Sequence, residues 1–554
     1  MALFAGVDIG NSTTEIVIAE GITPIAWERL PTRGCKGSEA SVRSAAALLR
    51  NIERKAGVEV SQVIVAPWHP ITTEVTRFHK PPPDTGKIQV IGCANHSVVG
   101  NSWATGKPWN ISKTPARAIP VVAIVESETG YKQASERINQ AIEQGITVSG
   151  VIAADDEAVL IASRLSTALP VVDRADCQTA LGAEKLFIEV RPAGQCVNTA
   201  TDVWALKNAL EAQGQEAESL NLVSRWVGDL RAVVIGLFEE SVNRSPAPAT
   251  PSVTFCTGES VDLADAMPLL RSRFVGSVCA LNLEETIRTR DVWGVDIDGV
   301  LADRGVRAYG QSGRMALASL SNPVSEPRDS LSTVFEVPVT VANSESEAAS
   351  IGARTTPGLS REAIILDIGG GTIDLVGNDG SVTAAGAGEL LSAAVAAVLD
   401  VPKGAADWIK RGPAQRLDSA QVLLSENGSY DFVPAKDAPR LANSPGMLVT
   451  PGPTGPLSFG RNMQPAEWRI IRQSLKLEII GRNVSRILQT YTDKLASDET
   501  FDIVIVGGPA EDDELLPALG RLAEVRGLGR GNVAGSLGHR FAVAYGLTQS
   551  SVPG

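Results

Sequence analysis

The sequence predicts an α/β fold with two related lobes. Two glycine-containing loops support this prediction, residues 8–15 (DIGNSTTE) and residues 367–374 (DIGGGTID). Each loop follows an apolar run and precedes a second β-rich run, which indicates strand, tight turn and strand. A third segment, residues 501–510, is an apolar strand pattern that leads into Gly507 and Gly508. The three segments together predict that one nucleotide is held between the lobes.

Both loops have the composition of a phosphate-binding turn. Glycine allows backbone angles that other residues avoid and lets main-chain N–H groups approach an anion. Either loop alone is better explained as a β-hairpin turn, so the prediction depends on the pair and its order. The residues expected to hold the β- and γ-phosphates are Gly10, Asn11, Ser12, Thr13, Gly369, Gly370, Gly371 and Thr372.

An acidic residue ends the strand before each loop. Asp8 and Asp367 would repel a bare triphosphate, so we expect them to hold a Mg²⁺ ion, or its waters, that bridges the phosphates. The expected cofactors are therefore ATP or ADP and Mg²⁺. Gly507 and Gly508 are expected to flank the adenosine, because a nucleoside can lie against the backbone at the end of that strand.

A helical period begins at Pro465, with apolar residues spaced for one buried stripe. Lys476 and Glu478 lie on the same helix, before the adenosine strand. Lys476 is a candidate for adenine or ribose contact, and a solvated helix face is the alternative for both residues. The predicted stripe consists of Trp468, Ile471, Leu475, Ile479 and Val484.

Length and composition exclude several classes of protein. A chain of 554 residues predicts about three to four domains. It has no apolar run of about 20 residues, so we expect no membrane span. Gly6, Asp8 and Asn11 interrupt the N-terminal apolar run too early for a signal peptide, which predicts a cytoplasmic protein. Association with a bacterial microcompartment is left open by the sequence. The net charge of −13 argues against nucleic acid as a partner.

The cysteines and histidines do not form a metal-binding pattern. The six cysteines are far apart and include no Cys-x-x-Cys pair, and the four histidines have no metal-ligand spacing. We therefore expect buried, reduced thiols, with no disulfide and no zinc.

The order of the three nucleotide segments resembles the ATPase core of actin, sugar kinases and heat-shock chaperones. Far more chain separates the two phosphate loops than one lobe needs, so we expect insertions. After residues 81–84 (PPPD), alternating strands and helices predict a small α/β domain with a parallel sheet. Its predicted strands are residues 119–125, 147–152 and 169–172, and its predicted helices are residues 131–143 and 156–165.

Other segments complete the predicted division of the chain. Residues 206–237 have a mostly helical pattern, and residues 246–251 (PAPATP) are typical of a surface linker. Frequent prolines between residues 401 and 464 exclude long regular elements and predict a loop-rich insertion. The predicted parts are an ATPase core over 1–85, a linker over 86–118, a swivelling α/β domain over 119–200, a helical connection and linker over 201–250, core again over 251–400, the insertion over 401–464 and core over 465–554.

Residues 295–300 (VDIDGV) resemble the nucleophile loop of haloacid-dehalogenase phosphatases. In such loops one aspartate attacks phosphorus and the next acts as acid and base. Residues 290–294 are a poor pattern for a buried strand, and no matching downstream lysine and acidic pair is evident. We therefore expect a surface turn here.

Several further segments resemble the large subunit of diol and glycerol dehydratase reactivases. The two most discriminating are the Thr-Thr-Pro-Gly run and the Gly-Arg-Gly-Asn run, which actin-like ATPases in general lack. The similar segments are residues 6–15, 351–358 (IGARTTPG), 529–533 (GRGNV) through Gly538 to Gly546, 150–152, 155–156 and 170–173 (PVVD).

This resemblance implies an ATP-dependent chaperone that releases damaged cobalamin from an adenosylcobalamin-dependent diol or glycerol dehydratase, so that intact coenzyme can bind. It implies a reactivase small subunit as partner, the dehydratase as client, and a swivelling domain biased by the ATP and ADP states. The alternative is a small-molecule kinase of the same superfold, because fold does not determine function. An activator with an iron–sulfur cluster would require clustered cysteines, which the chain lacks.

The resemblance also suggests further site residues. Glu345 and Glu347 precede residues 351–353 much as the catalytic acid precedes a small-residue helix in chaperone ATPases, where a carboxylate orients water and accepts its proton. The alternative is that both glutamates lie at an exposed helix N-terminus, where acidic residues suit the helix dipole. Asp156 and Asp173 match positions where the family binds a divalent ion near the small subunit, and strand-end or N-cap acids are the alternative.

The sequence departs from the family in two places. Residues 367–372 are closer to the chaperone form of the second loop than to the reactivase form, and residues 509–511 (PAE) replace a serine-rich continuation. These departures do not weaken the prediction of ATP binding, but they leave the identity of the client open.

Overall fold

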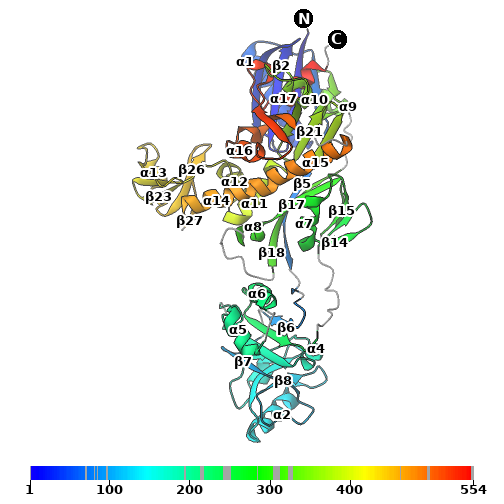
Figure 1. The fold of residues 1–554 in the computed structure, drawn as a ribbon. Coiled ribbons are helices and arrows are strands. Elements are labelled where there is room, and N and C mark those ends of the chain that lie inside the picture. The colour runs from blue at the N-terminus through cyan, green and yellow to red at the C-terminus, as the bar shows by residue number, and fades with distance from the viewer. Residues whose placement is uncertain are drawn as a thin grey trace. The chain divides into compact units, whose positions relative to one another are not determined.

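The structure is a computed structural model, and the chain in it forms two compact units (Figure 1). The first unit comprises Met1–Phe78, Ala249–Gly305 and Arg314–Gly554, and the second comprises His79–Pro248 and Val306–Gly313. The structure describes residues 2–68, 71–79, 82–83, 85–94, 98–115, 117–192, 195–212, 217–240, 251–283, 285–302, 312–321, 328–461, 463–495 and 500–550.

The first unit contains two five-stranded sheets with the same arrangement. In each sheet the first three strands along the chain are antiparallel, the fourth pairs in parallel with the first, and the fifth pairs in parallel with the fourth. This repetition confirms the prediction of two related lobes in an actin-like ATPase core. One sheet has the order β19-β4-β1-β2-β3, from β1 (Leu3–Ile9), β2 (Thr13–Glu20), β3 (Thr23–Pro31), β4 (Gln62–Val65) and β19 (Val339–Val341). The other has the order β22-β21-β20-β28-β29, from β20 (Ile364–Ile368), β21 (Thr372–Gly377), β22 (Gly380–Ala385), β28 (Phe501–Val506) and β29 (Val525–Arg530).

Helices cover both sheets. α1 begins after Ser38, whose side chain accepts the N–H of Ser41, and ends at Gly57 in the left-handed conformation that favours glycine. The apolar face of α1 is buried against the first sheet. The helices of this core are α1 (Glu39–Ala56), α9 (Arg328–Phe335), α10 (Glu345–Ala353), α11 (Gly388–Leu399), α16 (Leu515–Leu519), α17 (Ala542–Gln549) and the 3₁₀ turns η2 (Gly508–Glu511) and η3 (Val533–Gly535).

α10 and α17 cross at backbone contact, one helix from each lobe (Figure 1). A Cβ atom on Gly352 would lie 2.0 Å from the carbonyl oxygen of Ala542, and one on Gly546 would lie 1.8 Å from that of Ala348. Only glycine fits at these two positions, because the neighbouring atoms are backbone. The crossing therefore ties the two lobes together.

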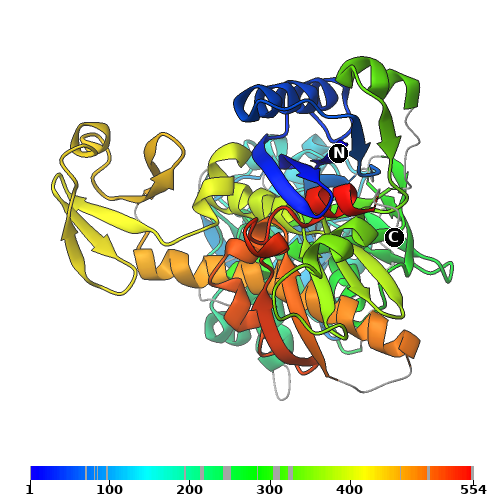
Figure 2. The same ribbon diagram turned by 90° about the horizontal axis from the view of Figure 1, so that it is seen from above.

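The predicted helix after Pro465 is present and its buried stripe is confirmed (Figure 2). It consists of α14 (Pro465–Lys476), a π-helical turn η1 (Leu477–Gly481) and α15 (Arg482–Leu495). The extra residue of a π turn accounts for the five-residue step from Ile479 to Val484, because both side chains are buried on one face.

The insertion over residues 401–464 contains a sheet, so its description as loop-rich is wrong. Five short antiparallel strands have the order β25-β24-β23-β26-β27 and extend away from the two lobes (Figure 2). The prolines limit the lengths of the elements rather than preventing them, and Pro451 pairs with Pro456 across the β26–β27 hairpin. The elements are α12 (Lys403–Ile409), β23 (Gln415–Ser419), β24 (Val422–Ser425), β25 (Tyr430–Phe432), α13 (Ala438–Leu441), β26 (Met447–Gly452) and β27 (Gly455–Arg461).

Two smaller sheets complete the first unit. They have the orders β14-β13-β15-β16 and β17-β18-β5. Their elements are β5 (Ile71–His79), β13 (Ser252–Phe255), β14 (Ser260–Asp262), α7 (Leu263–Ser272), β15 (Val278–Asn282), β16 (Thr286–Arg288), β17 (Asp291–Asp296), α8 (Ile297–Ala302) and β18 (Ser312–Leu320).

The phosphatase-like segment is not a surface turn. β17 is a buried strand, and α8 begins directly after it. Asp296 accepts the N–H of Gly299 at 3.0 Å, and Asp298 forms an ion pair with Arg314 at 2.6 Å. Both aspartates therefore hold the strand-to-helix junction. The strand was missed because its Trp and Gly do not form an alternating apolar pattern.

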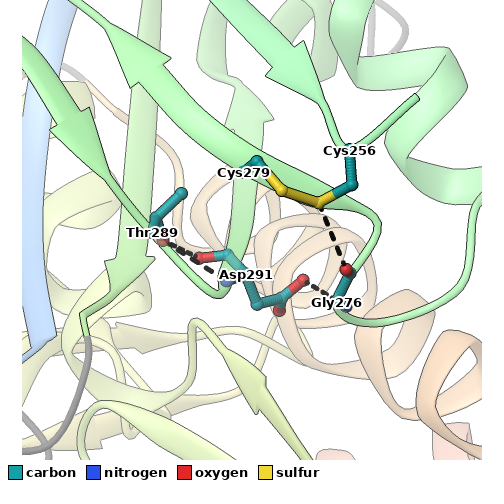
Figure 3. Close-up of a disulfide and its surroundings, with 5 residues drawn as sticks. All are labelled: Cys256, Gly276, Cys279, Thr289 and Asp291. Atoms are coloured by element: carbon teal, nitrogen blue, oxygen red, sulfur yellow. Dashed lines mark hydrogen bonds between the residues drawn. A yellow bond between two sulfur atoms is a disulfide. The ribbon is translucent and has the colours of Figure 1, made fainter. Parts of the chain in front are cut away.

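Cys256 and Cys279 form a disulfide, which contradicts the expectation of reduced thiols (Figure 3). The antiparallel pairing of β13 with β15 brings their Cα atoms to 5.1 Å, although 23 positions separate them in sequence. The expectation of burial is also wrong for two other cysteines, because Cys35 and Cys196 are exposed. Cys177 is buried, as expected.

The second unit contains a seven-stranded mixed sheet of order β10-β9-β8-β7-β11-β12-β6. β7 to β10 are parallel, with α2 and α3 in their connections, which confirms the predicted parallel sheet over residues 119–172. The antiparallel strands β11, β12 and β6 extend it. The elements are β6 (Ile88–Ala94), β7 (Ser102–Asn110), β8 (Val121–Val125), α2 (Tyr131–Glu143), β9 (Val148–Ala153), α3 (Ala158–Ala162), β10 (Val171–Val172), α4 (Cys177–Leu181), β11 (Lys185–Val190), α5 (Val203–Leu210), α6 (Ala217–Trp226) and β12 (Ala232–Leu237).

Two expectations for this part of the chain are wrong. Residues 86–118, expected as a linker, contain β6 and β7, and residues 206–237, expected as helical, end in β12. β12 pairs with β11 and with β6, which lies more than 130 residues earlier in the chain, so its strand conformation is decided by tertiary pairing. The predicted linker at residues 246–251 lies almost entirely outside the described residues. Within the described part of the chain, no helix combines the length and the apolar character needed to cross a membrane.

Candidate nucleotide-binding site

A cavity of about 710 Å³ lies within the first unit. Residues from both predicted phosphate loops line it, together with the paired glycines after β28 and several acidic residues. The structure thus brings three segments that lie more than 130 residues apart in sequence to one cavity. The predicted residues in its lining are Asp8, Gly10, Asn11, Ser12, Thr13, Glu345, Asp367, Gly369, Gly370, Gly371, Thr372, Gly507 and Gly508.

The two phosphate loops have the same backbone turn. The N–H of Gly10 donates to the carbonyl of Thr13 at 2.9 Å, and the N–H of Gly369 donates to that of Thr372, also at 2.9 Å. In each case the turn joins the first two strands of a lobe. The loops are therefore equivalent parts of the two lobes and face one another across the same cavity.

Close approach, rather than unusual backbone angles, explains the loop glycines. None of Gly10, Gly369, Gly370 and Gly371 has the left-handed conformation that the sequence argument invoked. A Cβ on Gly370 would lie 2.8 Å from the Ser12 hydroxyl oxygen, and one on Gly371 would lie 2.4 Å from the amide nitrogen of Asn11. Glycine is needed here because the other loop occupies the space of a side chain.

Gly507 is required for a different reason. Its φ is +87°, and a Cβ there would lie 2.4 Å from a carboxylate oxygen of Asp367. Its N–H donates to the carbonyl of His539 at 2.9 Å. The turn after β28 therefore lies directly beside the strand-end carboxylate of the second lobe.

Five of the carboxyl groups that line the cavity influence one another. Asp8 and Asp367 pair across their hairpins with Glu15 and Asp374, and Glu345 begins α10. Burial, followed by the charge of Glu345, raises the pKa of Asp8, and burial, followed by the charge of Asp374, raises the pKa of Asp367. Such a concentration of acids is suited to binding a cation.

Two of these acids titrate close to neutral pH. Burial raises the pKa of Glu15 to about 7, although the positive charges of Arg540 and Arg29 oppose the shift. Burial and the charge of Glu345 raise the pKa of Asp374 to about 6, against the hydrogen bonds from Thr383 and Thr372. The cavity therefore holds protons that a bound cation would displace.

Lys36 is a largely buried cation beside these acids. Its Nζ lies 2.8 Å from Oε2 of Glu345, and its side chain is only 9% exposed. Burial alone would lower the pKa of Lys36, but the charges of Glu345 and Asp8 outweigh burial and raise it. Lys36 is thus held charged against the carboxylate of Glu345.

The structure separates the two glutamates proposed for water activation. Glu345 lines the cavity, whereas Glu347 is exposed and absent from the lining. The N–H of Glu347 donates to the Ser344 side chain, which caps α10. Glu345 is therefore the one placed to act on a ligand in the cavity, and Glu347 fits the alternative of an acid at a helix N-terminus.

The donor set fits a metal that is shared with a ligand. Oδ1 of Asp8 is buried and has no hydrogen-bond partner. Among the described residues, no group of three or more His, Cys, Asp or Glu side chains is arranged to hold a metal alone. Mg²⁺ commonly uses one or two carboxylates together with phosphate oxygens and waters, so Asp8 and Asp367 would suffice for a nucleotide-bound ion.

Lys476 is not on a solvated face. It is 2% exposed and forms ion pairs with Asp512 at 2.6 Å and Glu514 at 2.7 Å. Asp512 and Glu514 line the cavity, but Lys476 does not. Glu478 is half-buried and pairs with Arg271 at 2.5 Å, so the solvated alternative is also wrong for it.

Asp156 and Asp173 lie close together in the second unit. Asp173 is buried, its Oδ1 has no hydrogen-bond partner, and burial and Asp156 together raise its pKa to about 6. Asp156 is exposed and forms an ion pair with Arg174. Two carboxylates alone make an incomplete cation site.

Sequence reasoning missed Glu15, Asp374 and Lys36. The first two had a detectable signal, because each follows its loop aspartate by the same number of positions in the aligned segments DIGNSTTE and DIGGGTID. Lys36 had no such signal, since it lies in an irregular segment between β3 and α1.

The two discriminating family motifs contact each other. The hydroxyl of Thr356 accepts the N–H of Asn532 at 3.0 Å, and that of Thr355 accepts the N–H of Ala534 at 2.8 Å. These bonds join the end of α10 to the segment after β29. The motifs thus stabilise the core that positions Glu345.

Comparison with known proteins identifies the same two parts. The family model described as "Diol dehydratase reactivase ATPase-like domain" matches residues 289–551, and the one described as "DD-reactivating factor swiveling domain" matches residues 88–240. The chain is 26% identical to the diol dehydratase-reactivating factor large subunit of Klebsiella michiganensis and 26% identical to the propanediol dehydratase-reactivating factor large subunit of Citrobacter freundii, with 99% of this chain and 98% of each relative covered.

Solved structures agree on the fold. A diol dehydratase-reactivating factor in nucleotide-free form matches with a TM-score of 0.54 and 22% identity, and a glycerol dehydratase reactivase matches with a TM-score of 0.55 and 21% identity. Each match covers 99% of both chains. By the two family models, the chain therefore carries an ATPase-like domain and a swivelling domain of the diol dehydratase reactivase type.

Proposed function

We propose that this chain is the large subunit of an ATP-dependent reactivating factor. It releases damaged cobalamin from an adenosylcobalamin-dependent diol or glycerol dehydratase, so that intact coenzyme can bind. Relatives that match over nearly their full length carry reactivating-factor names, which favours this function over a small-molecule kinase. The partners are a reactivase small subunit and the dehydratase itself.

One observation carries the proposal. The Asp8 and Asp367 loops, which are equivalent parts of the two lobes, face one cavity that also receives Gly507. A nucleotide bound there contacts both lobes at once. Its ATP and ADP forms can change the arrangement of the lobes only if they contact the two loops differently, and the γ-phosphate supplies that difference.

The residues of the cavity have separable roles in ATP hydrolysis. Asp8 and Asp367 hold the magnesium ion or its waters, and the backbone N–H groups of both loops bind the β- and γ-phosphates. Magnesium, when bound, neutralises phosphate charge. Glu345 orients the attacking water and accepts its proton, and Lys36 fixes the Glu345 carboxylate through their ion pair.

In the swivelling domain, Asp156 and Asp173 form half of a divalent-cation site. The unpartnered Oδ1 of Asp173 supports this role, because a buried carboxylate oxygen without a partner is costly. A carboxylate of the small subunit would complete the ligand set. The cation would then join the two subunits.

The test is recovery of a glycerol-inactivated, adenosylcobalamin-dependent diol dehydratase. This chain is added alone and with a candidate small subunit, with ATP, Mg²⁺ and free adenosylcobalamin each omitted in turn. Recovery that requires all three would support the proposal. No recovery despite an intact ATPase would favour the kinase alternative or another client.

A further inference from the structure

The Cys256–Cys279 disulfide lies in the first unit (Figure 3). Cys256 follows β13 directly and Cys279 lies in β15, and both residues are exposed. Attack by a thiolate requires access to one of the sulfur atoms, so exposed disulfides are the labile ones. This bond is therefore open to thiol–disulfide exchange.

The surrounding sheet does not depend on the bond. The N–H of Cys256 donates to the carbonyl of Ser277 at 2.8 Å, and that of Phe255 donates to Glu259 at 2.8 Å. Val253 and Phe255 are fully buried beneath these strands. Because backbone pairing and apolar burial remain after reduction, we expect the sheet to stay folded in both redox states.

A continuous set of contacts leads inward from the disulfide. Sγ of Cys256 lies 3.8 Å from the carbonyl oxygen of Gly276, in the turn between α7 and β15. The N–H of Gly276 donates to Oδ1 of Asp291 at 3.3 Å (Figure 3). The preceding residue of the same turn, Val275, donates its N–H to the hydroxyl of Thr490 on α15 at 3.0 Å.

Asp291 connects this turn to the second lobe. It is 1% exposed and forms an ion pair with Arg486 at 2.7 Å. Its Oδ2 accepts the N–H of Ala385, at the end of β22, at 2.9 Å. The next residue, Gly386, donates its N–H to the carbonyl of Gly371 at 2.8 Å. The contacts thus end at the second phosphate loop.

We propose that Cys256 and Cys279 form a reversible redox site that controls nucleotide affinity through Gly276 and Asp291. The reductant is a dithiol. One of its thiolates attacks a sulfur of the bond and forms a mixed disulfide, and its second thiol closes the reductant to a cyclic disulfide. The chain gains two electrons and two protons and holds two free thiols.

The effect of reduction on nucleotide affinity follows from the conformational freedom of the chain between the two cysteines. Reduction frees the chain between residues 256 and 279, so the turn at Gly276 must be ordered without a covalent anchor when the nucleotide binds. The oxidised chain therefore binds nucleotide more tightly. By linkage, bound nucleotide must make the disulfide harder to reduce by the same factor.

This inference rests on the proposed nucleotide site, and the test separates the two. Binding of Mg²⁺–ADP to the full chain is measured by calorimetry after incubation in oxidised or reduced dithiothreitol, with the state of each cysteine determined by alkylation and peptide mass spectrometry. We expect about fivefold or more weaker binding by the reduced chain. Saturating ADP should lower the reduction potential of the disulfide by about 20 mV if the effect on affinity is fivefold.

Two variants supply the controls. The double variant C256S/C279S should bind ADP with one affinity in both buffers, whereas C35S/C196S, which removes the two other exposed thiols, should keep the redox response. Equal affinity in both redox states of the unmodified chain, or absence of the Cys256–Cys279 peptide under oxidising conditions, would overturn the redox site alone. Failure of both forms to bind ADP would overturn the nucleotide site and the redox inference together.

Discussion

Lys36 and Glu345 form an ion pair of 2.8 Å in the wall of the nucleotide cavity, although 309 positions separate them in sequence. The pair joins an irregular segment after β3 to the first residue of α10. The charged Lys36 side chain holds the Glu345 side chain in place among other acidic residues of the cavity wall. A carboxylate fixed in this way can accept a proton from water.

Glu345→Gln should reduce ATP turnover by about 100-fold or more, because an amide cannot accept the proton of the attacking water. Glu347→Gln is the matched control on the same helix, and it should keep turnover close to that of the unmodified chain. Steady-state phosphate release, with ADP affinity measured in parallel, checks both. Equal losses in the two variants would contradict the assignment of Glu345.

Replacing both loop carboxylates, Asp8→Ala with Asp367→Ala, should lower Mg²⁺-dependent ATP hydrolysis to about 1% or less of the original rate. The cause is loss of the oxygens that hold the ion or its waters. The rate is measured over a Mg²⁺ titration. Hydrolysis at an undiminished rate would show that the nucleotide site lies elsewhere.

The ligand-free chain should lose stability as the pH rises from about 4.5 to about 7. Glu15 has a pKa of about 7 in the folded chain against 4.5 ordinarily, so over this range the folded state retains a proton that the unfolded state releases. The contribution of Glu15 to the free energy of unfolding is therefore fully present below pH 4.5 and is lost as the pH rises through 7. This contribution is roughly 3 kcal/mol at most. Thermal unfolding over pH 5 to 8 measures it, and Glu15→Gln should reduce the slope of the profile.

Gly546→Ala should destabilise the first unit by about 1–3 kcal/mol, because its Cβ would overlap the carbonyl oxygen of Ala348 where α10 and α17 cross. Gly404→Ala is the control. Gly404 lies in α12 with open space around it, so alanine there should be neutral or stabilise by up to about 1 kcal/mol. Urea unfolding of both variants distinguishes a steric effect at the crossing from a general effect of losing glycine.

Asp173→Asn should weaken Mg²⁺-dependent association with the small subunit by about tenfold or more, since loss of a ligand costs at least as much as loss of an outer-shell group. The exposed neighbour Asp155→Asn should have little effect. Association of the unmodified chain should strengthen between pH 5 and 7, because the pKa of Asp173 is about 6 and a metal requires the deprotonated form. Association that is independent of both Mg²⁺ and pH would contradict this site.

Features encoded over short stretches of chain were predictable from the sequence. The helix over Tyr131–Glu143 was predicted with the bounds that the structure has, because its apolar residues follow the helical period. Both phosphate loops were predicted from turn composition next to apolar strands. By contrast, β12 was missed because it pairs with a strand far away in sequence, and β17 was missed because its Trp and Gly do not form an alternating apolar pattern.

Turn chemistry and hydrophobic periodicity are local properties, so the two loops, their strand-end aspartates and a core with insertions could be predicted from the sequence. Folding of the chain was needed to show that Lys36 pairs with Glu345 and not Glu347, that Cys256 bonds to Cys279, and that Lys476 is buried against Asp512 and Glu514. These contacts join residues that meet through strand pairing and helix packing. No local pattern specifies such partners, because each depends on how the whole chain is folded.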